Sequence, residues 1–216
     1  MTEKSLVVRK NANLARYSSD RDAEKPVSFL SEQEIYKLAD AARGDLIIGG
    51  ERFKTKRDGE RNELLIITMF QCALRVSEAT GVHVKDKFQV EDTYVLGIMG
   101  KGHKPRLVAC PESLYMRLGN YASEHGLKPD DRFFPISRVR AWQIVKVAAK
   151  KAGIERRVYN HLLRHTGAVM RLKRTGNPKS LQMFLGHSDM KMTMRYLKTT
   201  QMLTSLEVEG KVNFDR

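Results

Sequence analysis

The sequence predicts an α+β protein that is mainly helical and carries a small three-stranded antiparallel sheet. Most of the chain places apolar residues three and four positions apart, which is typical of helices with one buried face. Between residues 82 and 110 this spacing gives way to three short β-prone runs. We therefore expect one helical domain over residues 27–200, between a flexible N-terminal arm or linker remnant (1–26) and a C-terminal tail (201–216).

The composition favours a polyanionic partner. The chain has 216 residues, 41% of them hydrophobic, and its 39 Lys and Arg residues against 25 Asp and Glu residues give a net charge of +14. Such a positive field is typical of nucleic-acid binding, although a basic ribosome-associated protein would share it. Apolar runs fall short of the roughly 18 residues that span a bilayer, and the two cysteines, Cys72 and Cys110, lack metal-ligand spacing. We expect a reduced, cytoplasmic protein without membrane contact.

The first helix has a sharp N-terminal signal. Ser31 and Glu34 have the spacing of a capping box, and the apolar pattern continues toward the Gly49-Gly50 pair. A basic loop over residues 51–59 follows. By default it is a solvated run of charges, but its cations are also candidate DNA contacts: Arg52, Lys54, Lys56 and Arg57.

Residues 61–78 read as one strongly apolar helix with Arg75 near its end. A buried guanidinium needs a partner, because an unpaired one is costly. Glu78, three residues later, could be that partner. Alternatively, Arg75 lies at the floor of a cleft that receives a phosphate. The sequence gives the two interpretations equal weight.

The predicted sheet comprises runs at Val82–Val84, Thr93–Met99 and Arg106–Cys110. A glycine-punctuated turn over residues 100–105 links the last two runs and places Lys101 at the tip of a hairpin. A lone lysine on a hairpin is usually only solvated. Its functional interpretation, a cation that projects toward a partner, is weak in isolation.

Helices are predicted again at 112–124 and from a Ser137 cap to Lys151. The second has an apolar side with Val139, Trp142, Val145 and Ala149, and a basic side that could follow DNA or simply be solvated. Its candidate DNA contacts are Arg138, Arg140 and Lys146. Three short helices should follow, at about 160–175, 178–185 and 189–198, the last capped by Ser188.

The last third of the chain gathers groups suited to a phosphodiester. His161 and Arg164 lie one helical turn apart, His187 follows the helix-stopping Gly186, and Tyr196 ends the stretch. Guanidiniums bind non-bridging oxygens, imidazoles move protons, and a phenol can attack phosphorus. His161 and His165 have the spacing of zinc ligands, but the glutamate that metalloproteases carry beside the first histidine is replaced here by leucine, so we expect no metal.

Four motifs in order resemble the catalytic domain of the tyrosine recombinases, the phage integrase and Xer-like site-specific recombinases. They are ALRVSEAT, GKGHKPRLV, HLLRHTGA and LGHSDMKMTMRY, and the resemblance covers about residues 27–200. It implies the DNA breaking-rejoining fold and a strand exchange without metal, ATP or another cofactor. Tyr196 would attack the scissile phosphate to form a 3′-phosphotyrosyl link and free a 5′-hydroxyl.

The resemblance also implies a role for each matching residue. Arg75 and Arg164 would clamp the phosphate, and Lys101 would protonate the leaving 5′-oxygen. His161 would assist proton transfer at the nucleophile, while His187 would hydrogen-bond the phosphate. Glu78 would orient Arg75.

The implied partner is double-stranded DNA, bound by a homotetramer on paired sites, with a monomer expected in the absence of DNA. The 26 residues before the capping box are too few for the core-binding domain of most family members, so we expect weak, salt-sensitive DNA binding. Two alternatives stay open. One is strand nicking and resealing like that of a type IB topoisomerase or telomere resolvase, and the other is a DNA-binding module without catalysis.

Overall fold

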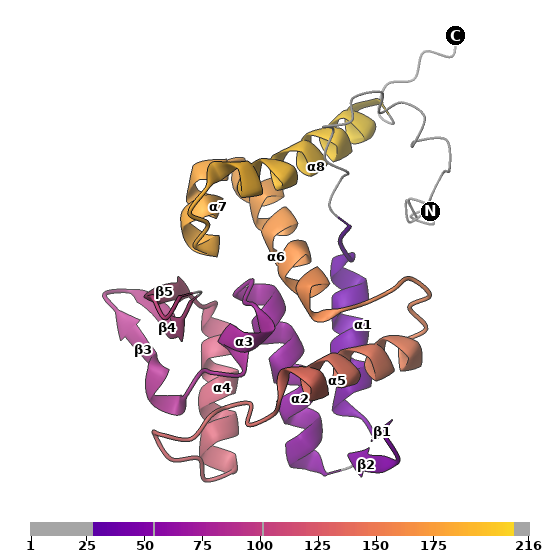
Figure 1. Cartoon of the computed structure of the whole chain (residues 1–216), viewed down its shortest axis with the longest axis vertical. Helices are drawn as coiled ribbons and strands as arrows, with labels where there is room; N and C mark the ends of the chain where they lie inside the picture. Colours follow the sequence, from indigo (N-terminus) through magenta and orange to yellow (C-terminus); the bar gives the residue numbers. More distant parts are fainter. Residues whose placement is uncertain (1–27, 54, 101, 210–216) are drawn as a thin grey trace.

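The computed structural model describes residues 28–53, 55–100 and 102–209; the predicted N-terminal arm lies outside the described residues. It is mainly helical with small antiparallel sheets, as predicted (Figure 1). The elements are α1 (Glu32–Arg43), β1 (Leu46–Ile48), β2 (Glu51–Phe53), α2 (Lys56–Gln71), α3 (Val76–Ala79), the 3-10 turn η2 (Val84–Asp86), β3 (Lys87–Val90), β4 (Thr93–Met99), β5 (Pro105–Ala109), α4 (Glu112–Glu124), α5 (Arg138–Lys151), α6 (Asn160–Thr175), α7 (Pro178–Leu185) and α8 (Met190–Glu209).

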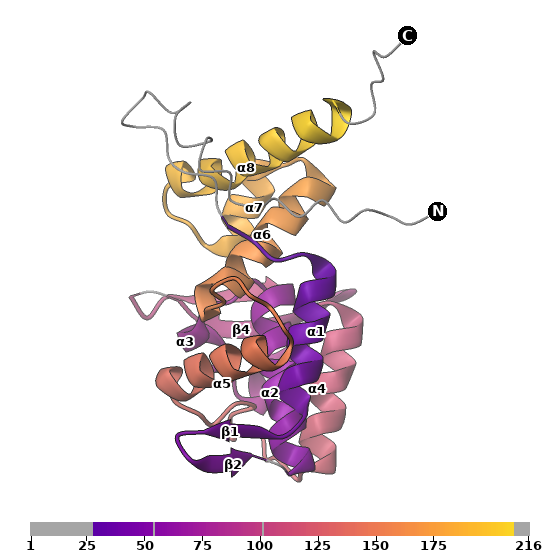
Figure 2. The same ribbon diagram turned by 90° about the vertical axis from the view of Figure 1, so that its right-hand side faces the viewer.

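Helices α1, α2 and α4 lie side by side, and α5 crosses α1 and α2 (Figures 1 and 2). Helix α2 is central to the core, with nine consecutive buried residues from Asn62 to Phe70. The capping box of α1 is present, since Ser31 Oγ accepts from Glu34 N and the Glu34 carboxylate accepts from Ser31 N. In the part of the chain that the structure describes, no helix is long and apolar enough to cross a membrane.

The first helix is shorter than predicted. It ends at Arg43, and β1 and β2 form a hairpin in the region expected to be helix and loop. Gly49 and Gly50 form its two-residue turn with φ of 60° and 82°, a left-handed conformation that favours glycine at both positions. The glycine pair therefore marks a strand turn, and the predicted basic loop is partly strand and partly the start of α2.

The prediction of one helix over residues 61–78 was wrong. Helix α2 ends at Gln71, and α3 begins after Arg75. Between them Ala73 has a φ of 46°, which is uncommon for a residue with a side chain. Continuous hydrophobicity could not reveal this break, because Cys72 and Leu74 stay fully buried in the turn. As a result Arg75 lies at the N-terminus of α3, outside the long helix.

A three-stranded antiparallel sheet in the order β3-β4-β5 confirms the predicted sheet. Its first strand, however, lies at Lys87–Val90 instead of Val82–Val84. The earlier segment pairs elsewhere, because Val84 N donates to Asp131 O and Phe133 N donates to Val82 O.

The later helices α4 to α7 have the predicted bounds, but one detail of the prediction for α5 and two for α8 were wrong. Val139 and Trp142 of α5 are 65% and 40% exposed, so the buried face is centred on other residues: Ala141, Ile144, Val145, Ala148 and Ala149. Helix α8 continues to Glu209, well past residue 198. Asp189, not Ser188, accepts a hydrogen bond from an amide of its first turn, that of Lys191.

Helices α6, α7 and α8 stand at the end of α2, next to α3 (Figure 1). Gly167 permits this junction, since a Cβ atom there would collide with the backbone carbonyl of Phe70. Arg171 adds a hydrogen bond from its guanidinium to Gln71 O. The close approach brings α6 against the break between α2 and α3, where the predicted site residues meet.

Candidate active site

Glu78 lies at the centre of an arginine cluster. Its Oε1 accepts from Arg75 Nη1 at 2.7 Å, and its Oε2 accepts from Arg75 N at 2.8 Å. Two further guanidiniums approach Oε2, Arg106 at 3.3 Å and Arg164 at 3.4 Å. The Glu78 side chain is 2% exposed while that of Arg75 is 27% exposed. The predicted pairing of Arg75 with Glu78 is therefore present, and part of the Arg75 side chain stays open to solvent.

Arg164 projects from α6 and is almost completely buried. Its Nη1 donates to Ala73 O at 2.6 Å, and its Nη2 donates to Leu185 O at 2.8 Å. Burial, with repulsion from Arg75, lowers its pKa to about 10, so the side chain stays charged at neutral pH. The two carbonyl bonds fix the guanidinium plane, because each nitrogen has a separate acceptor.

His187 follows α7 and contacts both Arg164 and α8. Its Nε2 lies 3.4 Å from Arg164 Nη2, and its Nδ1 lies 3.0 Å from the hydroxyl of Thr193. Burial, with the charge of Arg164, lowers the pKa of His187 to about 4. The imidazole is therefore neutral at pH 7, and the Thr193 hydroxyl can serve either tautomer as donor or acceptor.

Tyr196 lies on α8 with its ring buried among residues of α6 and α7. Its Oη lies 2.7 Å from His165 Nδ1, and its ring stacks on that of His187 with a centroid distance of 6.3 Å. Burial raises the pKa of Tyr196, although Arg164, Arg195 and Arg75 oppose the rise. The phenol is therefore protonated at neutral pH.

His161 lies one turn before His165 on α6. Its ring meets that of His165 edge-on, with the ring centroids 4.5 Å apart. Partial burial and the charge of Arg164 lower the pKa of His161. The structure thus brings together Arg75, His161, Arg164, His187 and Tyr196 with Glu78. Lys101, the remaining predicted member, lies outside the described residues.

Comparison with known proteins shows the family to which the chain belongs. Residues 28–202 match the model of the phage integrase family. The chain belongs to that family. A tyrosine recombinase from Pseudothermotoga lettingae is 34% identical over 173 residues, which cover 78% of this chain and 55% of the relative. The tyrosine recombinase XerA from Saccharolobus solfataricus is 31% identical over 189 residues, with coverages of 88% and 56%. The chain spans about half the length of these relatives.

Solved structures share the fold of this integrase-family chain. The XerH site-specific recombinase, in a post-cleavage complex with a palindromic difH substrate, matches with a TM-score of 0.71 at 22% identity, over 89% of this chain and 55% of that one. The catalytic domain of bacteriophage HP1 integrase matches with a TM-score of 0.59 at 23% identity, over 88% of this chain and 99% of that one. The likeness confirms the predicted fold.

The predicted DNA contacts of the integrase-family chain fall into two groups. Arg52, Lys56 and Arg57 lie at the end of α2 opposite the arginine cluster, while Lys54 lies outside the described residues. Arg52 pairs with Asp45 at 2.7 Å. These cations are thus remote from the cluster, and at least Arg52 and Lys56 have acidic partners.

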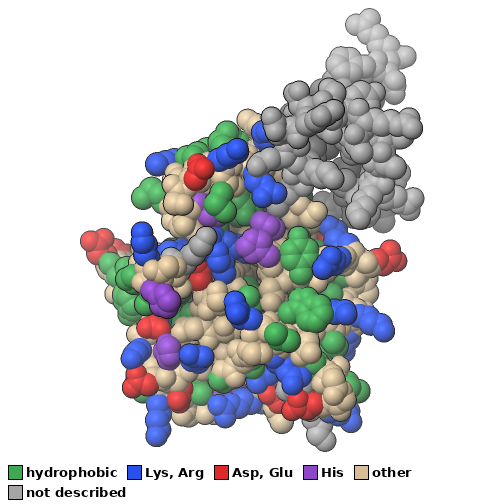
Figure 3. Space-filling view, viewed as in Figure 1, with side chains coloured by type: hydrophobic (Ala, Val, Ile, Leu, Met, Phe, Trp, Pro, Cys, Tyr) green, Lys and Arg blue, Asp and Glu red, His purple; other side chains and the backbone are tan. Residues whose placement is uncertain are grey.

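The members of the α5 group differ in position, because Arg138 lies next to α3 whereas Arg140 reaches Glu51 of β2, at the end remote from the cluster. Arg138 helps to line an open pocket of about 360 Å³ with Ser77, Thr80 and Gly81, next to α3. Arg140 pairs with Glu51 at 2.9 Å, and Lys146 lies over the ring of Trp142 at 5.1 Å. Figure 3 shows Lys, Arg and His side chains gathered on this face, below α7 and α8.

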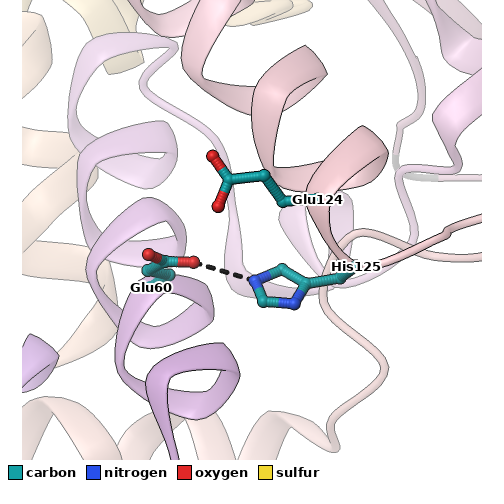
Figure 4. A group of neighbouring side chains, drawn as sticks. All are labelled: Glu60, Glu124 and His125. Atoms are coloured by element: carbon teal, nitrogen blue, oxygen red, sulfur yellow. Dashed lines mark hydrogen bonds and ion pairs between the residues drawn. The ribbon is translucent and has the colours of Figure 1, made fainter.

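A second cluster of titratable side chains lies at the remote end of α2. Glu60, Glu124 and His125 place potential metal-ligand atoms within 4.8 Å of one another (Figure 4). The ammonium of Lys56 already lies 3.1 Å from Glu124 and 3.7 Å from Glu60, and His125 Nε2 lies 2.8 Å from Glu60. We interpret the group as an ion-pair network that joins α2 to α4.

Three side chains of the candidate active site were not predicted from the sequence: Arg106, His165 and Thr193. Arg106 lies within a β-strand pattern, where a partly inward-facing arginine gives no separate signal. His165 was considered only as a metal ligand. Its position one turn after His161 and next to Arg164 could have placed it on the same face of α6. Thr193 has no sequence signal.

Proposed function

We propose that this chain cleaves and rejoins DNA strands as a site-specific recombinase, through a covalent 3′-phosphotyrosyl intermediate at Tyr196. One observation carries the proposal: Arg75 and Arg164 converge on Glu78, with His187 and the phenol-bearing helix packed against the same cluster. Two fixed guanidiniums beside a tyrosine suit a phosphodiester, because they balance the charge that develops on the phosphoryl oxygens.

Arg75 and Arg164 have different parts in this proposal. Arg164 is held by two carbonyls and is buried, so it provides a fixed charge. Arg75 keeps an exposed portion and can reach a bound phosphate while Glu78 holds it. Preorganised donors of this kind typically contribute on the order of 10²–10³ in rate.

The proton transfers are assigned to neighbouring groups. Lys101 gives a proton to the leaving 5′-oxygen, His161 assists proton transfer on the nucleophile side, and His187 donates a hydrogen bond to the phosphate. That donation needs a proton on His187 Nε2, so Nε2 would no longer accept from Arg164 Nη2 and the Thr193 hydroxyl would donate to Nδ1. The reaction uses only side chains of the chain and conserves the phosphate bond energy in the tyrosyl link, so it requires neither metal nor ATP.

Double-stranded DNA is the proposed partner, with a tetramer assembled on paired sites. The net charge of +14 supports an electrostatic attraction to DNA. The continuation of α8 beyond Tyr196 supplies a segment that could contact a second copy.

A covalent-capture experiment tests the proposal. The full chain is incubated at low salt with a library of nicked duplexes of randomised sequence, so that cleavage near the nick releases a short strand and traps the adduct. Denaturing gels then reveal protein–DNA adducts, whose DNA is sequenced to define a substrate. We expect adducts with the native chain and none with Tyr196→Phe.

Further results separate the alternatives. Adducts joined to Tyr196, followed by strand exchange between two labelled sites, support recombination. Relaxation of a supercoiled plasmid without recombinants favours simple nicking and resealing. DNA binding without any adduct would contradict catalysis and leave only a DNA-binding module.

A further inference from the structure

His165 is a half-buried side chain of the candidate active site to which the proposed function gives no role. It projects from α6 one residue after Arg164, and its Nδ1 lies 2.7 Å from Tyr196 Oη. The oxygen proposed as the nucleophile therefore hydrogen-bonds directly to His165. The ring of His161 packs edge-on against His165 and limits its rotation.

The charges around His165 fix its protonation state in the free protein. His161 and Arg164 face it from α6, His187 from the α7–α8 connection, and Arg195 and Tyr196 from α8. Burial lowers the pKa of His165 to about 3, together with repulsion from the charges of Arg195 and Arg164 and from His161 and His187 when they are protonated. The imidazole is therefore neutral, and the protonated phenol donates its hydrogen to Nδ1.

A bound phosphodiester changes this balance. Its negative charge, placed beside Arg75 and Arg164, would offset the positive charges that disfavour an imidazolium at His165. Binding of DNA therefore makes His165 a stronger base at the moment when the phenol must lose its proton. No rearrangement of Tyr196 relative to His165 is needed, because the donor–acceptor distance is already that of a hydrogen bond.

We propose that His165 is the catalytic base that accepts the phenolic proton of Tyr196. The inference rests on the proposed function and adds a residue to it. In cleavage the proton moves from Tyr196 Oη to His165 Nδ1 as Oη bonds to phosphorus. The bond from phosphorus to the 5′-oxygen breaks, and that oxygen takes a proton from Lys101. Rejoining reverses both transfers, and His161 assists by holding the His165 ring.

The same contact restrains the enzyme when no DNA is bound. Burial raises the pKa of the Tyr196 phenol and lowers the pKa of His165 to about 3. Proton transfer from the phenol to the imidazole is therefore strongly disfavoured in the free protein. Tyr196 stays protonated until a phosphate arrives.

The test compares His165→Asn and His165→Ala with the native chain on the duplex found by covalent capture. Asparagine can place Oδ1 where Nδ1 was, so it accepts the phenolic hydrogen bond but cannot take the proton. We expect both variants to cleave about 100-fold more slowly or worse at pH 7, the usual contribution of a general base. The Asn variant should gain rate with pH between 7 and 9, because hydroxide replaces the missing base.

A sulfur-substituted substrate distinguishes the loss of the catalytic base from the loss of the catalytic acid. A duplex with a bridging 5′-sulfur at the scissile bond has a leaving group that needs no proton, so it should rescue Lys101→Ala but neither His165 variant. His125→Gln, at the remote end of α2, is the matched control and should cleave like the native chain. Urea unfolding and binding to the same duplex verify that each variant folds.

Each remaining outcome decides against the inference. Cleavage by His165→Asn within about threefold of the native rate would show that His165 acts only as a hydrogen-bond acceptor. Faster cleavage by His165→Ala than by the native chain would show that His165 only restrains Tyr196. An equal loss at every pH would assign it a structural role. If the native chain forms no adduct, the proposed function fails and this inference with it, whereas native adducts with a fast His165→Asn variant overturn the inference alone.

Discussion

Glu78 holds Arg75 through two separate hydrogen bonds, one to the guanidinium at 2.7 Å and one to the backbone N–H at 2.8 Å. The second bond also caps α3, because Glu78 lies three residues after the N-cap position. One carboxylate therefore fixes both the backbone and the side chain of Arg75. The same carboxylate is also the negative partner of the Arg106 and Arg164 guanidiniums.

Removal of this carboxylate should destabilise the fold. Glu78→Ala leaves three guanidiniums without their shared counter-ion, and we expect the free energy of unfolding to fall by about 3–5 kcal/mol. Urea unfolding of the free protein measures it. The control is Glu32→Ala, which breaks an exposed pair with Arg174 and should cost less than about 1 kcal/mol. Equal losses in the two variants would contradict the central role of Glu78.

Arg164→Lys tests the geometry of the buried guanidinium. A lysine keeps the charge but cannot reach Ala73 O, Leu185 O and Glu78 together, because its ammonium lacks the planar fork. We expect cleavage of a suicide duplex to slow on the order of 10²–10³-fold. Arg174→Lys, on the exposed end of the same helix, should cleave normally. Near-native cleavage by Arg164→Lys would show that charge alone is sufficient.

Local signals predicted much of the fold. Helices α5, α6 and α7 begin and end where caps and stop residues indicated: Ser137 accepts from Arg140 N, and Gly176 and Gly186 end their helices with φ of 64°. Such signals succeed because a cap satisfies backbone groups within a few residues. The resemblance to the tyrosine recombinases implied that Arg75 and Arg164 lie together, and both guanidiniums contact Glu78.

Long-range contacts account for what the sequence did not predict. The break after Gln71 is set by packing against α6, where Gly167 meets Phe70, and hydrophobicity continues through it. Val139 and Trp142 looked like core residues although the buried face of α5 is rotated away from them. The contact between His165 and Tyr196 joins residues 31 positions apart, and periodicity within either helix cannot indicate it.

Thr193→Val tests the support of His187. Valine has a similar shape but removes the hydroxyl that bonds His187 Nδ1 at 3.0 Å in a fully buried position. We expect cleavage to slow about tenfold, corresponding to a lost hydrogen bond of about 1 kcal/mol or slightly more. Thr175→Val, at an exposed helix end, is the matched control. An unchanged cleavage rate for Thr193→Val would show that the Thr193 hydroxyl does not contribute to the reaction.

The stability of the free protein should fall in mild acid. His165 and His187 have pKa values of about 3 and 4, below the 6.5 of an unfolded histidine. Between those values the unfolded chain binds more protons, so stability is full above pH 6.5 and declines as the pH falls toward 4. His165 and His187 are only partly buried, so solvent screens part of the effect, and from pH 6.5 to 5 we expect a loss on the order of 1 kcal/mol for each histidine. Urea unfolding at several pH values measures this, and His165→Asn should show a shallower decline than the native chain. The same decline in both would refute the assignment.

The two groups of basic side chains should differ in DNA binding. Arg138 is exposed at the start of α5 beside the pocket next to α3, whereas Lys56 lies between Glu60 and Glu124 at the remote end of α2. A cation already held by carboxylates releases few counterions from DNA, while an exposed one near the bound phosphate releases about one. We expect Arg138→Gln to weaken binding of a fluorescent duplex and to reduce the slope of log K against log salt by about 1. Lys56→Gln should change neither quantity. The reverse result would mean that DNA lies across the β1–β2 end of the molecule.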